Sequence, residues 1–395
     1  MAVLPVAADN IQQESTDGLQ TRRLLGLSWL HFLNDGSGNY LPGVLPAVLV
    51  SLHQSVALAG VVMGALLVGQ TLQLPAGWIE GRIGGRMFIV WGMLGVSVAA
   101  SFIGLAGSLS TLIPALIVIG ICSALFHPQA LAAARHLSGK QAGIGMSVFL
   151  VGGEIGRGVW PLVASFFVVS WGRQSLAFLA LPALISAVFL WRALPIQPPQ
   201  RKTISSPLHW RAHLPALSML VGFQTMRALA IFGVSTFMPV LWHVRGRSLT
   251  EGAALITVLL VVGVIGNLLG GHLSDKLSRR TILFGASSGS VVLLTLFLLS
   301  GGVFQWAVLG VLGIFLFVTQ PVGVLIGQEI FPHNRSLGSG IALGFSNGLA
   351  AMGIVILGLL IGHLHAEGVL WALVGGLGIA TIISSSPLLY PKKIS

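Results

Sequence analysis

Apolar runs of roughly 20 residues recur along the whole chain, and they limit its possible folds more than any other feature. As an α-helix, a run of that length crosses the ~30 Å hydrocarbon core of a bilayer. Only 8% of the residues are charged and the mean hydropathy is +0.91, whereas soluble domains carry about 25% charged residues. The sequence therefore predicts an all-α membrane protein.

Twelve such runs are expected to form transmembrane helices. They lie near residues 22–51, 56–79, 87–106, 110–134, 140–168, 174–194, 213–243, 248–272, 280–300, 303–330, 335–362 and 367–388. A polar, proline-rich segment, PIQPPQRKTISSPLHWR, separates the sixth run from the seventh. We therefore expect two six-helix halves, 22–194 and 213–395, joined by a cytoplasmic linker at 195–212 and preceded by a cytoplasmic tail at 1–21.

Basic residues divide unevenly between the two sides of this arrangement. With both termini in the cytoplasm, three lie outside (Arg173, Arg245 and Arg247) and two lie within runs (Arg157 and Arg227). The remaining sixteen lie on the cytoplasmic side: Arg22, Arg23, Arg82, Arg86, Arg135, Lys140, Arg192, Arg201, Lys202, Arg211, Lys276, Arg279, Arg280, Arg335, Lys392 and Lys393. This positive-inside bias explains the net charge of +11 without a nucleic-acid partner, and it favours a multi-pass protein of the inner (cytoplasmic) membrane.

An internal repeat supports the division into halves. GWIEGRIGGR follows the second run and HLSDKLSRR follows the eighth, which places Glu80 and Asp275 195 residues apart. The same offset relates Lys140 to Arg335. Carboxylates beside arginines at helix ends can close the cytoplasmic side through ion pairs. The expected cytoplasmic gate consists of Glu80, Arg82, Arg86, Asp275, Arg279, Arg280 and Glu329.

These features together resemble the major facilitator superfamily. More narrowly, the segments LNDGSGNYLPGVLP, SALFHPQALAAARHLSG and MSVFLVGGEIG in the N-terminal half resemble the fosmidomycin-resistance family of exporters. In the C-terminal half the resemblance depends chiefly on Arg227 and STFMP (235–239). The family commonly has Glu after the His-Pro pair of the fourth span and an amide after the Gly pair of the fifth, where this chain has Gln129 and Glu154. The resemblance implies two pseudo-symmetric halves and proton-driven export of a small anionic or amphipathic compound, such as a phosphonate antibiotic.

The first run contains an ionisable pair within HFLNDGSGNYLPG. At 100° per residue, His31 and Asp35 share one helix face, with Asn34 and Asn39 at its edges. A charge at the bilayer centre costs at least ~2.5–3.5 kcal/mol on insertion scales. One interpretation is a proton-coupling or substrate-orienting site, since the two side chains are one turn apart and can share a proton. The alternative is a buried polar pair that only fixes helix packing.

The fifth run also carries charges. Glu154 and Arg157 are three residues apart and are neighbours on one face, whereas Gly152 and Gly156 lie roughly 150° away from it. The glycines can therefore seat this helix against another while the charges face a cavity. A self-neutralising structural pair is the alternative interpretation.

Arg227 in the seventh run has no carboxylate within one helical turn, so we expect its partner to be Glu154, Asp35 or the substrate. His127, which precedes Pro128 in the fourth run, can titrate near neutral pH or can be a satisfied core histidine. Weaker candidates for lining the cavity are Asn39, Gln129, Gln224, Thr319 and Gln320.

Motifs for other chemistry are not found. The sequence contains no Walker loop, no nucleophile elbow and no paired metal-ligand spacing, and Ser37 lies on the side of its helix opposite His31 and Asp35. We therefore expect a monomeric secondary transporter without a cofactor, not an enzyme. It would export a small molecule in exchange for protons; proton-coupled uptake of an organic anion is the alternative, and a non-transporting receptor is a third class.

The charge bias gives a testable topology. A cysteine replacing Gln13 or Gln200 should be shielded from membrane-impermeant thiol reagents in intact cells, because both positions are expected in the cytoplasm. A cysteine replacing Gly246 should react with the same reagents. Labelling from outside at position 200 would contradict the proposed orientation.

Overall fold

The computed structural model describes residues 20–72, 75–76, 79, 86–139, 141–190, 210–331 and 335–390. These residues form helices and short connections, without a strand in any of the described ranges. The expected gate residues Glu80 and Arg82, the linker up to residue 209 and the tail up to residue 19 lie outside the described residues.

The N-terminal half follows the first six apolar runs. Its elements are α1 (Thr21–Asn39), α2 (Leu41–Ser51), η1 (Val56–Leu58), α3 (Ala59–Gln70), α5 (Met87–Leu105), α6 (Leu109–Leu137), α7 (Ala142–Trp171), η2 (Arg173–Ala180) and α8 (Leu181–Leu190). The first run is two helices instead of one, with Tyr40 between them and Pro42 in the first turn of α2. Proline is favoured at that position because the first turn of a helix does not use the missing N–H.

The C-terminal half follows the last six runs. Its elements are α9 (Trp210–Val244), α10 (Leu249–Ser274), α11 (Arg279–Leu299), α12 (Gly302–Ile330), α13 (Arg335–Gly340), a π-helix (η3, Ile341–Phe345), α14 (Ser346–Ser385) and η4 (Pro387–Leu389). Inside α14, His365 has φ 57° and ψ 168°, which are not helical angles, and so the chain turns there. The element labelled α14 therefore holds most of the eleventh expected run and most of the twelfth.

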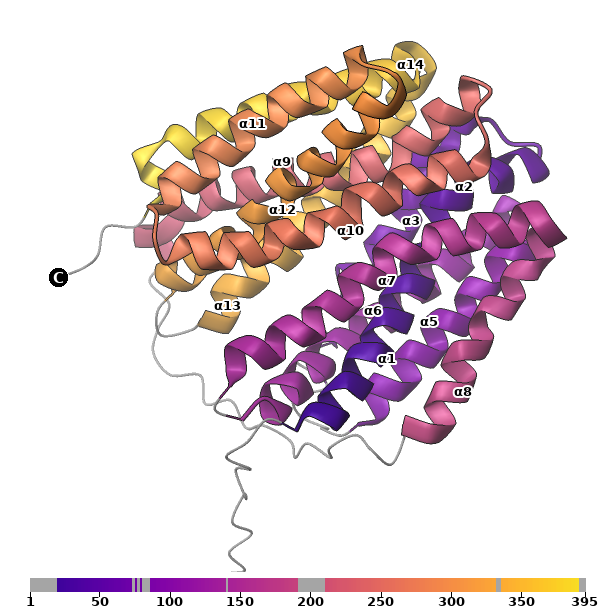
Figure 1. Cartoon of the computed structure of the whole chain (residues 1–395), viewed down its shortest axis with the longest axis horizontal. Helices are drawn as coiled ribbons and strands as arrows, with labels where there is room; N and C mark the ends of the chain where they lie inside the picture. Colours follow the sequence, from indigo (N-terminus) through magenta and orange to yellow (C-terminus); the bar gives the residue numbers. More distant parts are fainter. Residues whose placement is uncertain are drawn as a thin grey trace, which may run out of the picture.

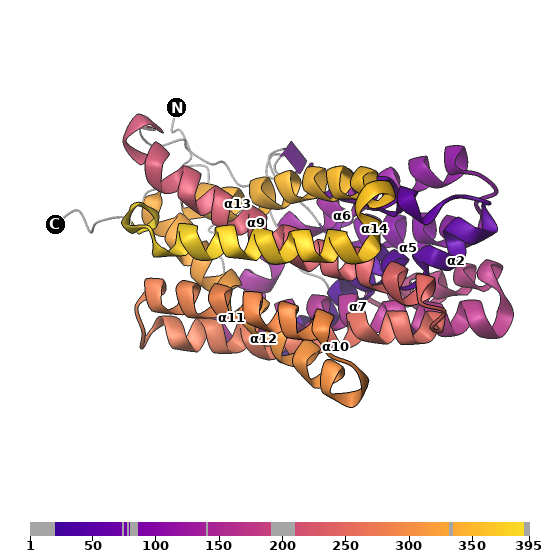
Figure 2. The same ribbon diagram turned by 90° about the horizontal axis from the view of Figure 1, so that it is seen from above.

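By length and composition, seven helices among the described residues can cross a membrane, and one of these, Leu337–Ser385, contains the turn at His365. Val56–Gln70 and Arg173–Phe189 are shorter apolar helices. Figures 1 and 2 show the two halves side by side, the N-terminal half in indigo and magenta and the C-terminal half in salmon to yellow. The expected all-α fold with two six-helix halves is confirmed.

Two pairs of helices make the main contacts between the halves: α7 packs on α10, and α3 packs on α14. Glycine makes the second contact possible, because a Cβ atom at Gly60 would collide with the Cα atom of Gly358 and the carbonyl oxygen of Ile354. Close backbone approach through small residues is a general means of packing helices in membranes.

The glycine step of α7 has the role expected from the sequence. A Cβ atom at Gly152 would collide with the carbonyl oxygen of Ser28, and one at Gly156 with that of Phe32. These two glycines therefore seat α7 directly against the backbone of α1, which fixes the distance between the two helices that carry most of the intramembrane charge.

The α3–α14 contact predicts unequal effects for one substitution at two glycines. Gly358→Val should lower the Tm of the detergent-solubilised protein by a few degrees, because overpacking at a close contact costs about 1–3 kcal/mol. Gly362→Val is the matched control, since it lies one turn further along the same helix and a Cβ atom there meets nothing within 4 Å. Equal Tm values for the two variants would contradict the packing role of Gly358.

Candidate functional site

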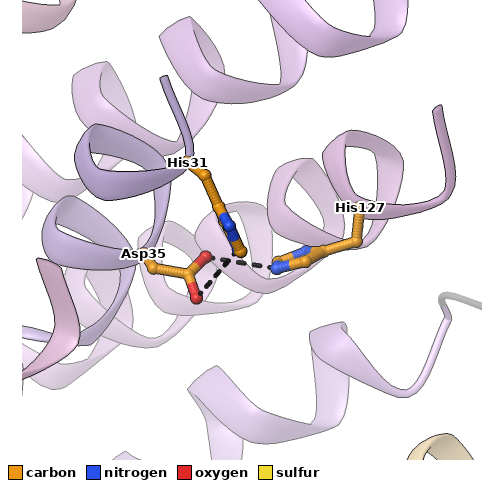
Figure 3. A group of neighbouring side chains, drawn as sticks. All are labelled: His31, Asp35 and His127. Carbon is orange, nitrogen blue, oxygen red and sulfur yellow. Dashed lines mark ion pairs between the residues drawn. The ribbon is translucent and has the colours of Figure 1, made fainter. Parts of the chain in front are cut away.

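Asp35 is the centre of a buried polar cluster in the N-terminal half. His31, one turn earlier on α1, places its Nε2 atom 3.5 Å from Asp35 Oδ2, and His127 of α6 places its Nε2 atom 3.2 Å from Asp35 Oδ1. Figure 3 shows both imidazole rings directed at the same carboxylate. The proximity of His31 to Asp35 was expected from helical periodicity, whereas the contribution of His127 to the cluster was not.

Backbone carbonyl groups hold both rings in place. The Nδ1 atom of His31 lies 2.8 Å from the carbonyl oxygen of Phe149, and that of His127 lies 2.7 Å from the carbonyl oxygen of Ser123. A carbonyl oxygen can only accept, so each Nδ1 must carry a proton and donate it. The ring of His31 also stacks on Phe149, with 4.1 Å between the ring centroids. Both Nε2 atoms are thereby oriented towards Asp35.

Two asparagines complete the surroundings of Asp35. The side-chain amide of Asn34 donates to Asp35 Oδ1 at 2.9 Å, and that of Asn39 donates to the Asp35 carbonyl oxygen at 2.9 Å. Asn34 is fully buried, with no exposed surface. Its amide therefore orients the carboxylate from within the helix packing.

The charged pair of α7 forms as expected. Arg157 Nη1 lies 3.4 Å from Glu154 Oε2, three residues away on the same helix. Arg157 lines the central cavity described below, whereas Glu154 is not part of its wall. The arginine is thus the member of the pair that can meet a ligand.

Arg227 has different partners from those expected. Its Nε atom donates to Gln224 Oε1 at 3.0 Å and its Nη1 atom donates to Gln320 Oε1 at 3.3 Å. In the described part of the chain it forms no ion pair with Glu154, Asp35 or another carboxylate, so of the three expected partners the substrate stays a prediction. Amide oxygens orient the guanidinium without neutralising it, and this side chain is only 5% exposed.

A cavity of about 140 Å³ lies between the halves. Of the residues singled out in the sequence, Asp35, Asn39, His127, Arg157, Arg227 and Gln320 line it. His31, Asn34, Gln129, Glu154, Gln224 and Thr319 do not line it. Gln224 instead holds Arg227, and the Thr319 hydroxyl donates to the carbonyl oxygen of Leu316 in its own helix.

Four polar lining residues were not identified from the sequence: Gln70, Thr71, Ser123 and Asn347. Each lies within a largely apolar run, Gln70 next to Thr71 and Asn347 next to Ser346, and polarity is the signal that could have identified them. Asn347 follows the π-helix in α14, and a π-turn changes the direction of the side chains after it. A regular α-helical projection of the sequence does not reproduce that change.

Four of the residues predicted for the cytoplasmic gate are described in the C-terminal half. Arg279 binds Glu329 through two nitrogens, with Nε–Oε1 at 2.9 Å and Nη2–Oε1 at 2.5 Å. Arg280 donates to the carbonyl oxygen of Ser385 at 2.7 Å, and Asp275 caps the end of α10. Arg279 and Glu329 lie on neighbouring helices of one half, so this ion pair stabilises that half and does not join it to the other.

The sequence and the fold were compared with known proteins. The chain is 26% identical over 384 residues to the uncharacterized MFS-type transporter YfnC of Bacillus subtilis, which covers 90% of each chain. It is also 26% identical over 358 residues to the fosmidomycin resistance protein of Escherichia coli, which covers 86% of each.

Solved transporters share the fold. A bacterial homologue of the human lysosomal transporter Spinster, in an inward-facing and unoccupied conformation, has a TM-score of 0.73 at 18% identity over 93% of this chain and 95% of that one. The nucleoside transporter NupG, solved as a mutant, has a TM-score of 0.76 at 13% identity over 92% and 98%. The family model of the Major Facilitator Superfamily matches residues 27–353 and 220–393. The chain therefore belongs to the major facilitator superfamily of multi-pass membrane transporters.

Proposed function

We propose that this transporter exports a small, partly apolar anion in exchange for protons, from a cell inner membrane in which both of its termini face the cytoplasm. The observation that carries the proposal is the state of Arg227, a buried guanidinium that two amide oxygens orient and that faces the cavity without a paired carboxylate. A buried charge is stable only when it is compensated. An anionic ligand in the cavity supplies that compensation.

The composition of the cavity wall supports this class of substrate. Arg157 adds a second guanidinium, and Ile231, Phe232 and Phe317 contribute an apolar surface beside Arg227. The arginines attract an anionic group and the apolar side chains accommodate a hydrophobic part. Export agrees with the similarity to the fosmidomycin resistance protein.

The proton would be carried by the cluster of His31, Asp35 and His127, with Glu154 as a second candidate carrier. Asp35 and His127 face the same cavity as the two arginines, so protonation of the cluster and occupation of the cavity influence each other through their charges. Rocking of the two halves about the cavity would expose it to one side of the membrane at a time.

Uptake of an organic anion together with protons is the second candidate, and one observation favours it. A bound anion and a proton on a neighbouring side chain attract each other. The cavity wall holds both the arginines that would bind the anion and the side chains, Asp35 and His127, that would carry the proton. The two candidates differ in the sign of a flux measurement. In proteoliposomes, exchange accumulates fosmidomycin or another small organic anion when the lumen is acidic, whereas co-transport accumulates it when the outside is acidic.

Arg227→Gln should weaken binding of an anionic probe such as fosmidomycin at least about tenfold, because a charged hydrogen bond contributes about 1.5–3 kcal/mol. Arg247→Gln, at an exposed loop position, is the matched control and changes the net charge by the same amount. Calorimetry on the two purified variants measures the difference. Wild-type affinity in Arg227→Gln would contradict the anion-site assignment.

Asp35→Asn should abolish flux driven by a pH gradient while the probe still binds, because the amide cannot gain and lose a proton whereas Arg227 is unchanged. Glu367→Gln, which removes an exposed carboxylate paired with Arg245, is the control and should transport like wild type. Proteoliposome uptake with an imposed pH gradient is the measurement. Full gradient-driven flux in Asp35→Asn would leave Asp35 with a packing role only.

A further inference from the structure

We propose that His31, Asp35 and His127 form a binding site for a divalent transition-metal ion such as Zn²⁺. One ligand atom from each of these three side chains lies within 4.8 Å of the others. Among the described residues, these three form the group of His, Cys, Asp or Glu side chains that is close enough to hold a metal ion. Two imidazoles and one carboxylate are a ligand set that favours zinc, cobalt and nickel over calcium and magnesium, which prefer oxygen ligands.

The separations between the ligand atoms fit an ion placed among them. With metal–ligand bonds of about 2.0–2.2 Å, two ligands of a tetrahedral ion lie about 3.3–3.6 Å apart. The Nε2–oxygen separations in the cluster are 3.5 Å and 3.2 Å. Charge-assisted hydrogen bonds between nitrogen and oxygen are usually shorter, at about 2.7–2.9 Å. The first separation lies within the range for coordination and the second just below it, so small side-chain movements would bring the three groups around one ion.

The surrounding groups prepare the ligands for a metal. Because each Nδ1 donates to a backbone carbonyl oxygen, the neutral form of each ring presents the lone pair of Nε2 towards Asp35 (Figure 3). Metal-binding histidines are commonly held in this way by a hydrogen bond from the other ring nitrogen. Asn34 fixes the carboxylate in the same manner, through its hydrogen bond to Oδ1.

Charge and access also allow a cation. Arg157 and Arg227 line the same cavity and oppose a cation there, but the ion pair with Glu154 offsets the charge of Arg157, and Asp35 supplies a negatively charged ligand. Asp35 and His127 line the cavity, so a metal ion can enter from it and a water molecule there can complete a four-coordinate site. His31 lies behind them at 4% exposure and closes the inner side of the site.

The inference does not rest on the proposed transport function, because binding can be measured without a substrate. The test uses the full chain, purified in detergent without a polyhistidine tag and titrated with Co²⁺. A tetrahedral cobalt site gives a strong visible absorption, and displacement by Zn²⁺ then reports the zinc affinity. The variants are His127→Gln, Asp35→Asn and, as the matched control, His243→Gln at an exposed position on α9.

We expect one cobalt ion per chain in the wild type and in His243→Gln. In His127→Gln and Asp35→Asn we expect at least about tenfold weaker binding, since even changes to the groups that orient metal ligands cost 10–100-fold. Zn²⁺ should raise the Tm of the wild type and not that of His127→Gln, whose metal-free Tm shows whether the variant is folded. Absence of saturable binding, or equal affinity in His127→Gln and wild type, would overturn the proposal.

Discussion

A carboxylate placed inside a membrane protein must be compensated by its surroundings, and much of the polar geometry in the N-terminal half follows from this constraint on Asp35. Two imidazoles and one side-chain amide face the carboxylate. Each imidazole is held by a backbone carbonyl oxygen, one of them from α7. A single buried charge therefore links α1, α6 and α7, and the glycine contacts between α1 and α7 bring the helices close enough for these bonds to form.

The buried charge of the C-terminal half has uncharged hydrogen-bond partners. Arg227 is oriented by Gln224 and Gln320, which are polar but uncharged, so its positive charge remains available to the cavity. Asp35 and Arg227 line the same cavity from different halves. One half thus presents a carboxylate that is surrounded by ionisable partners and the other a cation without a paired anion. This asymmetry is the basis of the proposed anion site and of its proposed response to protons.

The interface between the halves depends on close helix contacts. Gly60 and Gly358 bring α3 and α14 together through backbone atoms, and the bidentate Arg279–Glu329 pair remains within the C-terminal half. Contacts that depend on van der Waals packing between smooth helix surfaces can separate and reform without breaking buried ion pairs. Such an interface is compatible with the alternating access of its superfamily.

The sequence by itself determined where the helices lie, because the length of an apolar run and the positions of basic residues respond directly to the bilayer. Helical periodicity also placed His31 beside Asp35, a relation within one helix. Only the tertiary structure decided that His127, on another helix, joins them, that amides hold Arg227, and that Asn347 faces the cavity. These outcomes depend on how separate helices pack and on a local π-turn, and periodicity fixes the faces of a single regular helix without specifying which helix each face will meet.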